Sequence, residues 1–155
     1  MAQLEQRGPF LVLFALNQQL GSLLAQALAQ APLSPSDFAV YSALRLQQPS
    51  TLMELAGTLG MRPTTLSSVL ARMQQHGHLR REPNPADGRS RLISLTDTGR
   101  QVTEDCFPQF SGAIEAFRRH LRVDEQQALR YFEAVSSALR DAAGELAADG
   151  QQEAG

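Results

Sequence analysis

The sequence predicts a mainly α-helical fold with one small β-hairpin. Apolar residues recur at three- and four-residue spacing along much of the chain, which is typical of amphipathic helices. Two short helical segments meet at a turn near Gly60, and a strand, a turn-rich loop and a second strand follow between about residues 79 and 95. With 155 residues, 43% of them hydrophobic, the chain can fill the core of one domain, with or without extensions.

Charge is distributed unevenly along the chain, although the net charge is only −2. Residues 60 to 100 contain seven arginines and three acids, a net charge of +4, whereas the rest of the chain carries −6. A basic segment on an acidic chain is expected of a protein that binds a polyanion. All 14 basic residues are arginine, which suits phosphate and guanine contacts, although codon bias in a GC-rich genome is the simpler cause.

The N-terminal segment is predicted to be an uncharged helix of about twenty residues, since no charge occurs from Gly8 through Ser36. Its apolar run FLVLFAL resembles a signal peptide, but the run is interrupted by NQQ, and Glu5 precedes Arg7 where positive charge is expected. The same polar residues disfavour a membrane span. A helix this apolar must be covered, either by its own domain or by another chain.

A helix-turn-helix is predicted for residues 51 to 76. Thr51 and Glu54 form a capping-box sequence that starts a short helix, and Gly60 ends it. Pro63 suits the first position of the next helix, which Gly77 ends. Two short helices joined by a tight turn that contains glycine are typical of this motif.

Three further helices are marked by their first and last residues. Ser34 caps one that stops before Pro49. Thr96 caps a long helix that extends to about residue 121, in which Pro108 is expected to produce a kink or a break. Asp124 caps the last helix, and the small, polar tail that follows is expected to fray.

The outer face of the second helix of the motif carries small hydrogen-bonding residues and an arginine, with no acid. These candidate DNA contacts are Thr64, Thr65, Ser67, Ser68 and Arg72. Such a face fits the major groove, which admits one helix and is read by short polar groups and arginine. Taken alone, an ordinary solvated helix face would explain the pattern better.

The predicted hairpin makes the DNA interpretation stronger. Its strands are residues 79–82 and 91–95, and the loop between them contains prolines, Asp87, Gly88 and Arg89. A hairpin directly after a helix-turn-helix is a wing, and wings typically lie over the minor groove, which attracts arginine. We therefore add Arg89 and Arg91 to the candidate contacts and expect Asp87 to orient Arg89 through an ion pair.

The chain resembles the multiple antibiotic resistance regulator (MarR) family. The resemblance is carried by TLMELAGTLGMRPTTLSSVLARMQQHGHL and by RREPNPADGRSRLISLTDTG, in which Asp-x-Arg followed by a strand and Leu-Thr-x-x-Gly is the most specific part. It implies a homodimer that uses its N- and C-terminal helices as the interface and binds palindromic double-stranded DNA. Two positions depart from the family's pattern, Gly88 and Ser68, which are often basic in the family; they leave fewer DNA contacts in the same mode.

The resemblance sets the expected organisation of the chain. Residues 1–32 would be the N-terminal dimerisation helix, and 33–95 the DNA-binding lobe, with the recognition helix at about 63–76 and the wing at about 79–95. Residues 96–147 would be the C-terminal dimerisation helices, and 148–155 a flexible tail.

The resemblance also implies a small aromatic or phenolic effector, bound in a cleft between the dimer helices and the lobe. The candidate lining residues are Phe10, Phe14, Phe38 and Tyr41. Aromatic residues at helical spacing more often belong to the core, and we expect this of at least half of the four.

Other candidate sites give weaker signals. Cys106 is predicted to be an inert buried thiol, with oxidation sensing as the alternative. His76 and His78 fit a solvated helix end better than a metal site, because no acid or cysteine cluster accompanies them.

The sequence contains none of the common nucleophile, phosphate-binding, dinucleotide-binding or zinc-protease motifs, so neither an enzyme nor a cofactor is expected. The leading hypothesis is a cytoplasmic, bacterial or archaeal transcription regulator, with repression as its expected action and release by a small ligand as its expected control. The rival hypothesis is a winged-helix dimer that acts as a protein-interaction module without DNA binding.

Overall fold

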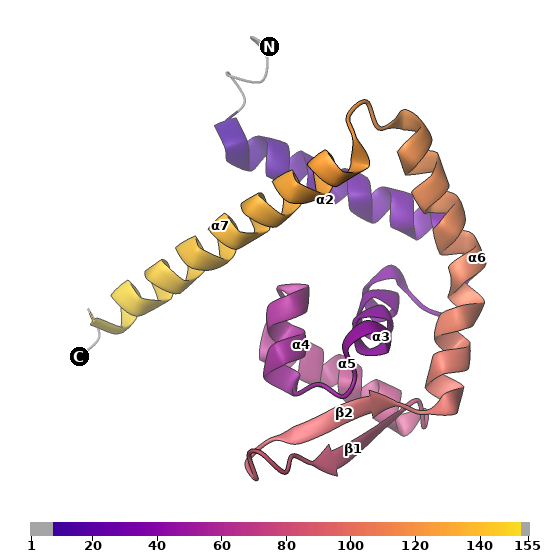
Figure 1. The fold of residues 1–155 in the computed structure, drawn as a ribbon, viewed down its shortest axis with the longest axis vertical. Helices are drawn as coiled ribbons and strands as arrows, with labels where there is room; N and C mark the ends of the chain where they lie inside the picture. The colour runs from indigo at the N-terminus through magenta and orange to yellow at the C-terminus, as the bar shows by residue number, and fades with distance from the viewer. Residues whose placement is uncertain (1–7, 153–155) are drawn as a thin grey trace. The chain divides into compact units, whose positions relative to one another are not determined.

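The computed structural model describes residues 8–152 and confirms the mainly helical fold with one hairpin (Figure 1). The elements in chain order are α2 (Gly8–Ala27), α3 (Pro35–Gln47), α4 (Leu52–Leu59), α5 (Pro63–Gln75), β1 (Leu79–Pro83), β2 (Arg91–Leu95), α6 (Asp97–His120) and α7 (Glu125–Gln152). Glu5 and Arg7, which argued against and for a signal peptide, lie outside the described residues, as does the end of the tail. The helix α7 includes residues 148–152 of that tail.

The chain divides into two compact units, Met1–Ile114 and Glu115–Gly155. The main core of the first unit lies among α3, α4, α5 and the hairpin. Its fully buried members include Leu44, Leu55, Leu66, Leu70 and Leu95. Burial of a leucine side chain contributes about 1.5–3 kcal/mol, so this cluster is what fixes α5 against the rest of the lobe.

The predicted caps around the helix-turn-helix are present. Thr51 Oγ1 accepts a hydrogen bond from the Glu54 amide, and the Glu54 carboxylate accepts one from the Thr51 amide at 2.7 Å. The Glu54 carboxylate also accepts a hydrogen bond of 2.9 Å from the Thr51 hydroxyl. The two hydrogen bonds that the carboxylate accepts, first that from the Thr51 amide and then that from the hydroxyl, lower the pKa of Glu54. Gly60 ends α4 with φ of 62°, a left-handed conformation that glycine adopts without steric cost, so the chain can turn sharply into α5.

The hairpin is antiparallel and pairs Leu79 with Leu95 and Arg81 with Ile93. Since side chains alternate along a strand, Leu79 and Arg81 share one face, and the partners of that face, Ile93 and Leu95, are buried in the core. The opposite edge of β2 is also paired, because Ser50 and Ile93 exchange two backbone hydrogen bonds of 2.8 and 3.1 Å. The strand β2 is therefore hydrogen-bonded along both of its edges at the base of the wing.

The first turn of α6 packs directly on the end of the recognition segment. Thr96 Oγ1 accepts a hydrogen bond from the Gly99 amide and donates one to the Gly77 carbonyl at 2.7 Å. A Cβ atom on Gly99 would lie 2.1 Å from the His78 carbonyl oxygen, closer than two such atoms can approach. The Leu-Thr-x-x-Gly pattern thus has a steric cause at this junction.

Pro108 does not break α6, which is continuous from Asp97 to His120. Proline removes one helical hydrogen bond, but the residues beside it are held by tertiary packing. Cys106 is fully buried in a second cluster with Leu28 and Phe38, and Phe107 is packed against this cluster. Of the kink or break expected at Pro108, the break is absent, because tertiary packing of the neighbouring residues stabilises the helix at this point.

The helix α2 has no buried residue. Phe10 is 76% exposed and Phe14 63% exposed, and further exposed leucines extend the apolar surface to Leu20. In length and mean hydropathy α2 resembles a membrane-spanning helix, a criterion that core helices and signal sequences also meet. An apolar helix surface of this kind requires cover.

In the second unit, α7 begins at the cap predicted for it. The Asp124 carboxylate accepts a hydrogen bond from the Gln127 amide at 3.0 Å, and Arg118 makes a bidentate ion pair with Glu125 across the loop. Large apolar side chains along α7 are between 40% and 52% exposed: Leu129, Phe132, Val135 and Leu139. The described part of this unit therefore also presents apolar surface to solvent.

Candidate nucleic-acid interface

The helix α5 has one buried and one exposed face, as the sequence predicts. Leu66, Val69, Leu70 and Met73 are buried, and Thr64, Thr65, Ser67, Ser68 and Arg72 are exposed. Helical geometry places Thr64, Ser68, Ala71 and Gln75 along the line opposite the core, with spacings of four and three residues. Ser67 and Gln74 lie on one flank of this line, and Thr65 and Arg72 on the other.

The hydroxyl of Ser68 donates a hydrogen bond of 3.2 Å to the Thr64 carbonyl within α5. A hydroxyl so bound still has lone pairs that accept hydrogen bonds, and it can rotate to donate elsewhere. No acidic residue occurs in α5, so the whole exposed face is neutral or positive. This face is chemically suited to the edges of bases and to phosphate groups.

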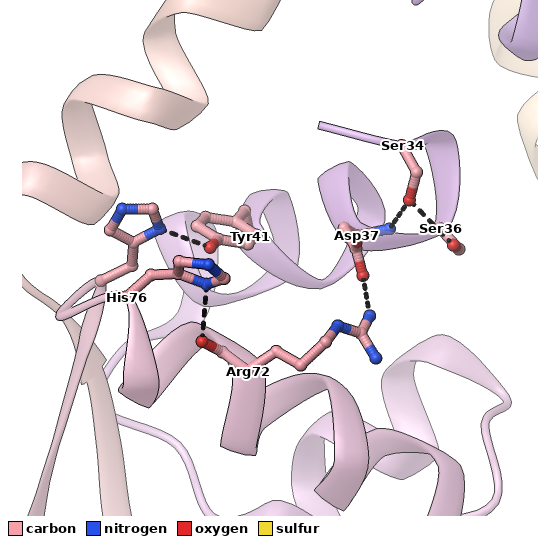
Figure 2. Close-up of polar contacts among 7 residues, drawn as sticks. Ser34, Ser36, Asp37, Tyr41, Arg72 and His76 are labelled. Carbon is pink, nitrogen blue, oxygen red and sulfur yellow. Dashed lines mark hydrogen bonds and ion pairs between the residues drawn. The ribbon is translucent and has the colours of Figure 1, made fainter. Parts of the chain in front are cut away.

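Arg72 is placed differently from its four companions. Its guanidinium Nη2 lies 2.6 Å from Asp37 Oδ1, and the pair joins α5 to the first turn of α3 (Figure 2). The side chain of Arg72 is 54% exposed and that of Asp37 26% exposed. The sequence placed Arg72 on an outward face, whereas the structure holds it against α3, because residue 72 lies on the α3 flank of α5.

Two histidines close the C-terminal end of α5. His76 Nδ1 lies 2.8 Å from the Arg72 carbonyl oxygen, and His78 Nδ1 lies 2.7 Å from the Tyr41 hydroxyl (Figure 2). The two imidazole rings stack with centroids 5.6 Å apart. Burial, and then the neighbouring His76, lowers the pKa of His78, while burial raises the pKa of Tyr41. Sequence reasoning missed the Tyr41–His78 contact, which joins residues 37 positions apart.

The tip of the wing is ordered by hydrogen bonds to the backbone. Asp87 Oδ1 accepts a bond of 3.0 Å from the Arg89 amide, and Asn84 Nδ2 donates one of 2.8 Å to Ser90 Oγ. The expected ion pair between the Asp87 and Arg89 side chains is not formed. The Asp87 carboxylate instead accepts the hydrogen bond of an Asx turn from the Arg89 amide. The turn thus positions the backbone of Arg89, while its exposed guanidinium is not held by Asp87.

The basic segment contains two groups of arginines. Three are in ion pairs with acids: Arg72, Arg80 and Arg100. Four make no ion pair within the described residues: Arg62, Arg81, Arg89 and Arg91. All four of these side chains are exposed, so their charge acts on whatever approaches the outer face of α5 and the wing.

A hollow of about 500 Å³ lies between α5 and β1. Its lining residues are Ser67, Ala71, Gln74, Gln75 and Arg81. Only Ser67 was among the residues selected from the sequence. The rotation of α5 about its own axis, relative to the hairpin, determines which of its residues line the hollow. This rotation depends on tertiary packing and cannot be predicted from a sequence pattern.

The structure does not bring the four predicted effector contacts together. Phe10 and Phe14 are exposed on α2, whereas Phe38 and Tyr41 are buried at 3% exposure each. Phe38 packs edge-on against Phe107 and Phe110 in the cluster around Cys106, and Tyr41 belongs to the main core. Two of the four are therefore core residues, as expected of at least half of them.

Cys106 is fully buried, as predicted, and burial raises the pKa of its thiol, which makes it a poorer nucleophile. Within residues 8–152, leaving aside the few masked side chains, no three histidine, cysteine or acidic side chains gather as metal ligands would. His76 and His78 accordingly lie at a helix end without further ligands.

A short helix, a tight glycine turn, an exposed helix free of acids and an arginine-tipped hairpin together define a winged helix-turn-helix of the class used by transcription regulators. Residues 31–90 match the model of the MarR family. The chain is similar to this family in sequence and in structure, and the resemblance stated from its sequence is confirmed.

Individual relatives agree over most of the chain. The multiple antibiotic resistance protein MarR of Salmonella typhimurium is 27% identical over 121 residues, 77% of this chain and 84% of that protein. A mutant MarR from E. coli, complexed with operator DNA, is 27% identical with a TM-score of 0.68, over 79% of this chain and 89% of its own. The PcaV transcriptional regulator of Streptomyces coelicolor, in complex with its natural ligand, is 26% identical with a TM-score of 0.69, over 87% of this chain and 93% of its own.

Proposed function

We propose that this chain is a homodimeric transcription regulator that represses by binding palindromic double-stranded DNA. The observation that carries the proposal is the outer surface of the lobe. There an acid-free helix face lies beside a wing whose Arg89 and Arg91 make no ion pair within the described residues. Thr64, Thr65, Ser67 and Ser68 would contact base edges or phosphates in the major groove, and Arg89 and Arg91 would contact the minor groove or its phosphates. The related E. coli MarR structure with operator DNA supports this mode.

Arg72 has a modified role in this proposal. Because Asp37 already binds its guanidinium, Arg72 fixes the position of α5 and reaches DNA only at the cost of that ion pair. Asp87 likewise shapes the wing through the Arg89 backbone, not through the Arg89 charge. Both residues are positioning residues for the interface.

Dimerisation would use the apolar surfaces of residues 1–32 and 96–147, with residues 33–95 as the DNA-binding lobe and 148–155 as a tail. The exposed apolar side chains of α2 and of α7 support this division, because each needs cover that the described chain does not give them. A two-fold dimer presents two recognition helices to half-sites one helical turn apart.

The proposal extends to control and location. The PcaV structure in complex with its natural ligand supports control by a bound ligand, and for this chain we propose a small aromatic one. For this chain, such a ligand would contact the exposed Phe10 and Phe14 where the dimer covers them, and Phe38 and Tyr41 would support the site from the core. The function belongs in the cytoplasm, where the DNA is, and it involves neither a catalytic step nor a cofactor.

A mobility-shift assay over a salt series tests DNA binding. With a duplex from the protein's own promoter region, affinity should fall steeply with salt, because each neutralised phosphate releases counterions. Arg89→Ala should weaken binding by about 1–3 kcal/mol if Arg89 makes a specific base-edge contact. Failure to bind any palindrome from that region would instead favour the protein-interaction module.

A thermal-shift screen with phenolic compounds tests the effector. A ligand that binds the folded dimer raises the melting temperature, and the stabilisation grows with the logarithm of its concentration above Kd. A compound that does so should also release DNA in the mobility-shift assay if it is the effector.

A further inference from the structure

The hollow between α5 and β1 is lined mostly by residues that are not among the predicted DNA contacts. Ser67, Gln74 and Gln75 lie on α5, and Arg81 enters the lining from β1. All three side chains from α5 offer hydrogen-bond donors, and Arg81 adds a fork of five N–H groups and a positive charge. Among the described residues no acid lines the hollow, and the one apolar residue in this lining is the small Ala71.

The direction of Arg81 follows from the register of the hairpin. Arg81 pairs with Ile93 and shares its face with the buried Leu79, so its side chain lies on the side of the strand that packs toward α5. Arg80 and Glu82 lie on the opposite face, where their side chains form an ion pair at 3.1 Å. Two adjacent arginines of one strand thus have different roles.

The polar groups of the hollow are not used by the protein itself. Among the described residues, the side chains of Ser67, Gln74, Gln75 and Arg81 make no hydrogen bond or ion pair with one another or with their neighbours, although all four are exposed. A concave, acid-free surface with convergent donors and one guanidinium fits a tetrahedral anion, since arginine binds phosphate oxygens in a bidentate manner.

We propose that this hollow is a seat for one backbone phosphate of the DNA strand beside the major groove occupied by α5, with Arg81 as the charged contact and Gln74, Gln75 and Ser67 as neutral donors. The inference rests on the proposed DNA-binding function and assigns contacts to three residues outside the set given above. A phosphate fits better than a base at this position, because the N-terminal part of a recognition helix contacts base edges, whereas Gln74 and Gln75 lie in its last turn. A phosphate contact adds affinity without sequence preference.

The test compares Arg81→Gln with Arg80→Gln, by fluorescence anisotropy of labelled duplexes between about 50 and 200 mM salt. Both variants lose one charge from the same strand, so long-range electrostatics are matched. Arg81→Gln should reduce the steepness of log K against log salt by about 0.9 for each phosphate that is no longer neutralised, about 1.8 for a dimer. It should do so equally on the promoter duplex and on a random-sequence duplex.

Arg80→Gln should leave the salt slope at the wild-type value, because Glu82 already neutralises Arg80. In this variant the negative charge of Glu82 is no longer paired, so it repels DNA and lowers the affinity. The control therefore cannot hide a loss of affinity caused by Arg81→Gln. Arg81→Lys should keep the slope, since the charge remains. Thermal melts should show all three variants folded, as expected for exposed positions.

Single methylphosphonate substitutions in the duplex locate the phosphate. One substituted position per half-site should weaken wild-type binding and have no further effect on Arg81→Gln. Equal slopes for Arg81→Gln and Arg80→Gln would overturn the phosphate seat while leaving DNA binding intact, as would a loss confined to one DNA sequence. Inorganic phosphate that shifts the Gln74 and Gln75 side-chain amide signals, with no methylphosphonate effect, would also overturn it. Absence of wild-type binding to every duplex would overturn both this inference and the proposed function.

Discussion

Gly99 shows how one missing side chain lets the DNA-binding lobe close on α6. Replacing Gly99 with alanine places a Cβ atom 2.1 Å from the His78 carbonyl oxygen, and the obstacle is backbone, which moves little. We expect Gly99→Ala to lower the free energy of unfolding by about 1–3 kcal/mol, as measured by urea denaturation, the usual cost of overpacking.

Gly112 in the same helix provides a matched control, because a Cβ there meets no atom within 4 Å. Gly112→Ala should stabilise the protein by about 0.5–1 kcal/mol, since glycine is a poor helix former. Equal effects of the two substitutions would show that the contact with His78 does not limit position 99.

His78 makes stability depend on pH. Burial and the adjacent His76 keep its folded pKa below the ordinary value, so the unfolded chain binds more protons in this range. The free energy of unfolding should therefore be fully developed above about pH 6.5, the unfolded value, and should decrease as the pH falls through the range between the unfolded and folded pKa.

Urea denaturation at a series of pH values should show this decrease in the wild-type protein and a flatter profile in His78→Gln. The groups that face His78 are the Tyr41 hydroxyl and the His76 ring, and neither is negative in this pH range. His120→Gln, at the exposed end of α6, serves as the control. A profile that stays unchanged in His78→Gln would contradict this origin of the pH dependence.

At the scale of elements, the wing depends on one acceptor oxygen at its tip. Asp87→Asn keeps an oxygen for the Arg89 amide but removes the negative charge, whereas Asp87→Ala removes both. We expect Asp87→Ala to weaken DNA binding several-fold, on the order of 1 kcal/mol for the lost hydrogen bond, and Asp87→Asn to bind at least as tightly as the wild type. Titrations of the promoter duplex with the three proteins measure this difference.

An Asp87→Asn variant as weak as Asp87→Ala would show that charge, and not turn geometry, is what the wing needs at this position. The structure would then represent an arrangement of the Arg89 side chain that changes on binding DNA.

The helices could be predicted from their ends, because capping is a local interaction. Thr51 with Glu54, Gly60 and Thr96 fixed three boundaries in sequence and in structure alike. The continuity of α6 through Pro108 could not be predicted, because burial of the neighbours of this proline depends on residues distant in sequence. The partner of Arg72 and the lining of the hollow were missed for the same reason, since both depend on how α5 is rotated against α3 and β1.

At the scale of the whole molecule, the exposed apolar surface is the feature that calls for a second chain. Phe10→Ser combined with Phe14→Ser should shift the monomer–dimer equilibrium toward monomer, as measured by sedimentation equilibrium, because each buried phenylalanine contributes about 1.5–3 kcal/mol to an interface of this kind. The melting temperature of the wild type should rise with protein concentration, and that of the variant should do so less.

Leu46→Ser is the control for this experiment, because Leu46 is 83% exposed but lies at the end of α3. It should leave the dimer intact. Equal dissociation of both variants, or of neither, would mean that α2 does not form the interface. The apolar composition of the N-terminal helix predicted that another surface must cover it. Which surface does so depends on the packing of two chains, and one sequence alone does not predict that packing.

Because Cys106 is buried, its reaction with a thiol reagent can be used to measure local unfolding around α6. Cys106 is the single thiol in the chain, and it is buried in the folded protein. A thiol reagent can therefore modify it only during brief local unfolding that separates α6 from its packing. When reclosing is fast, the labelling rate measures the population of the locally unfolded state. The same measurement with DNA or an effector bound would then report whether either ligand rigidifies this part of the molecule.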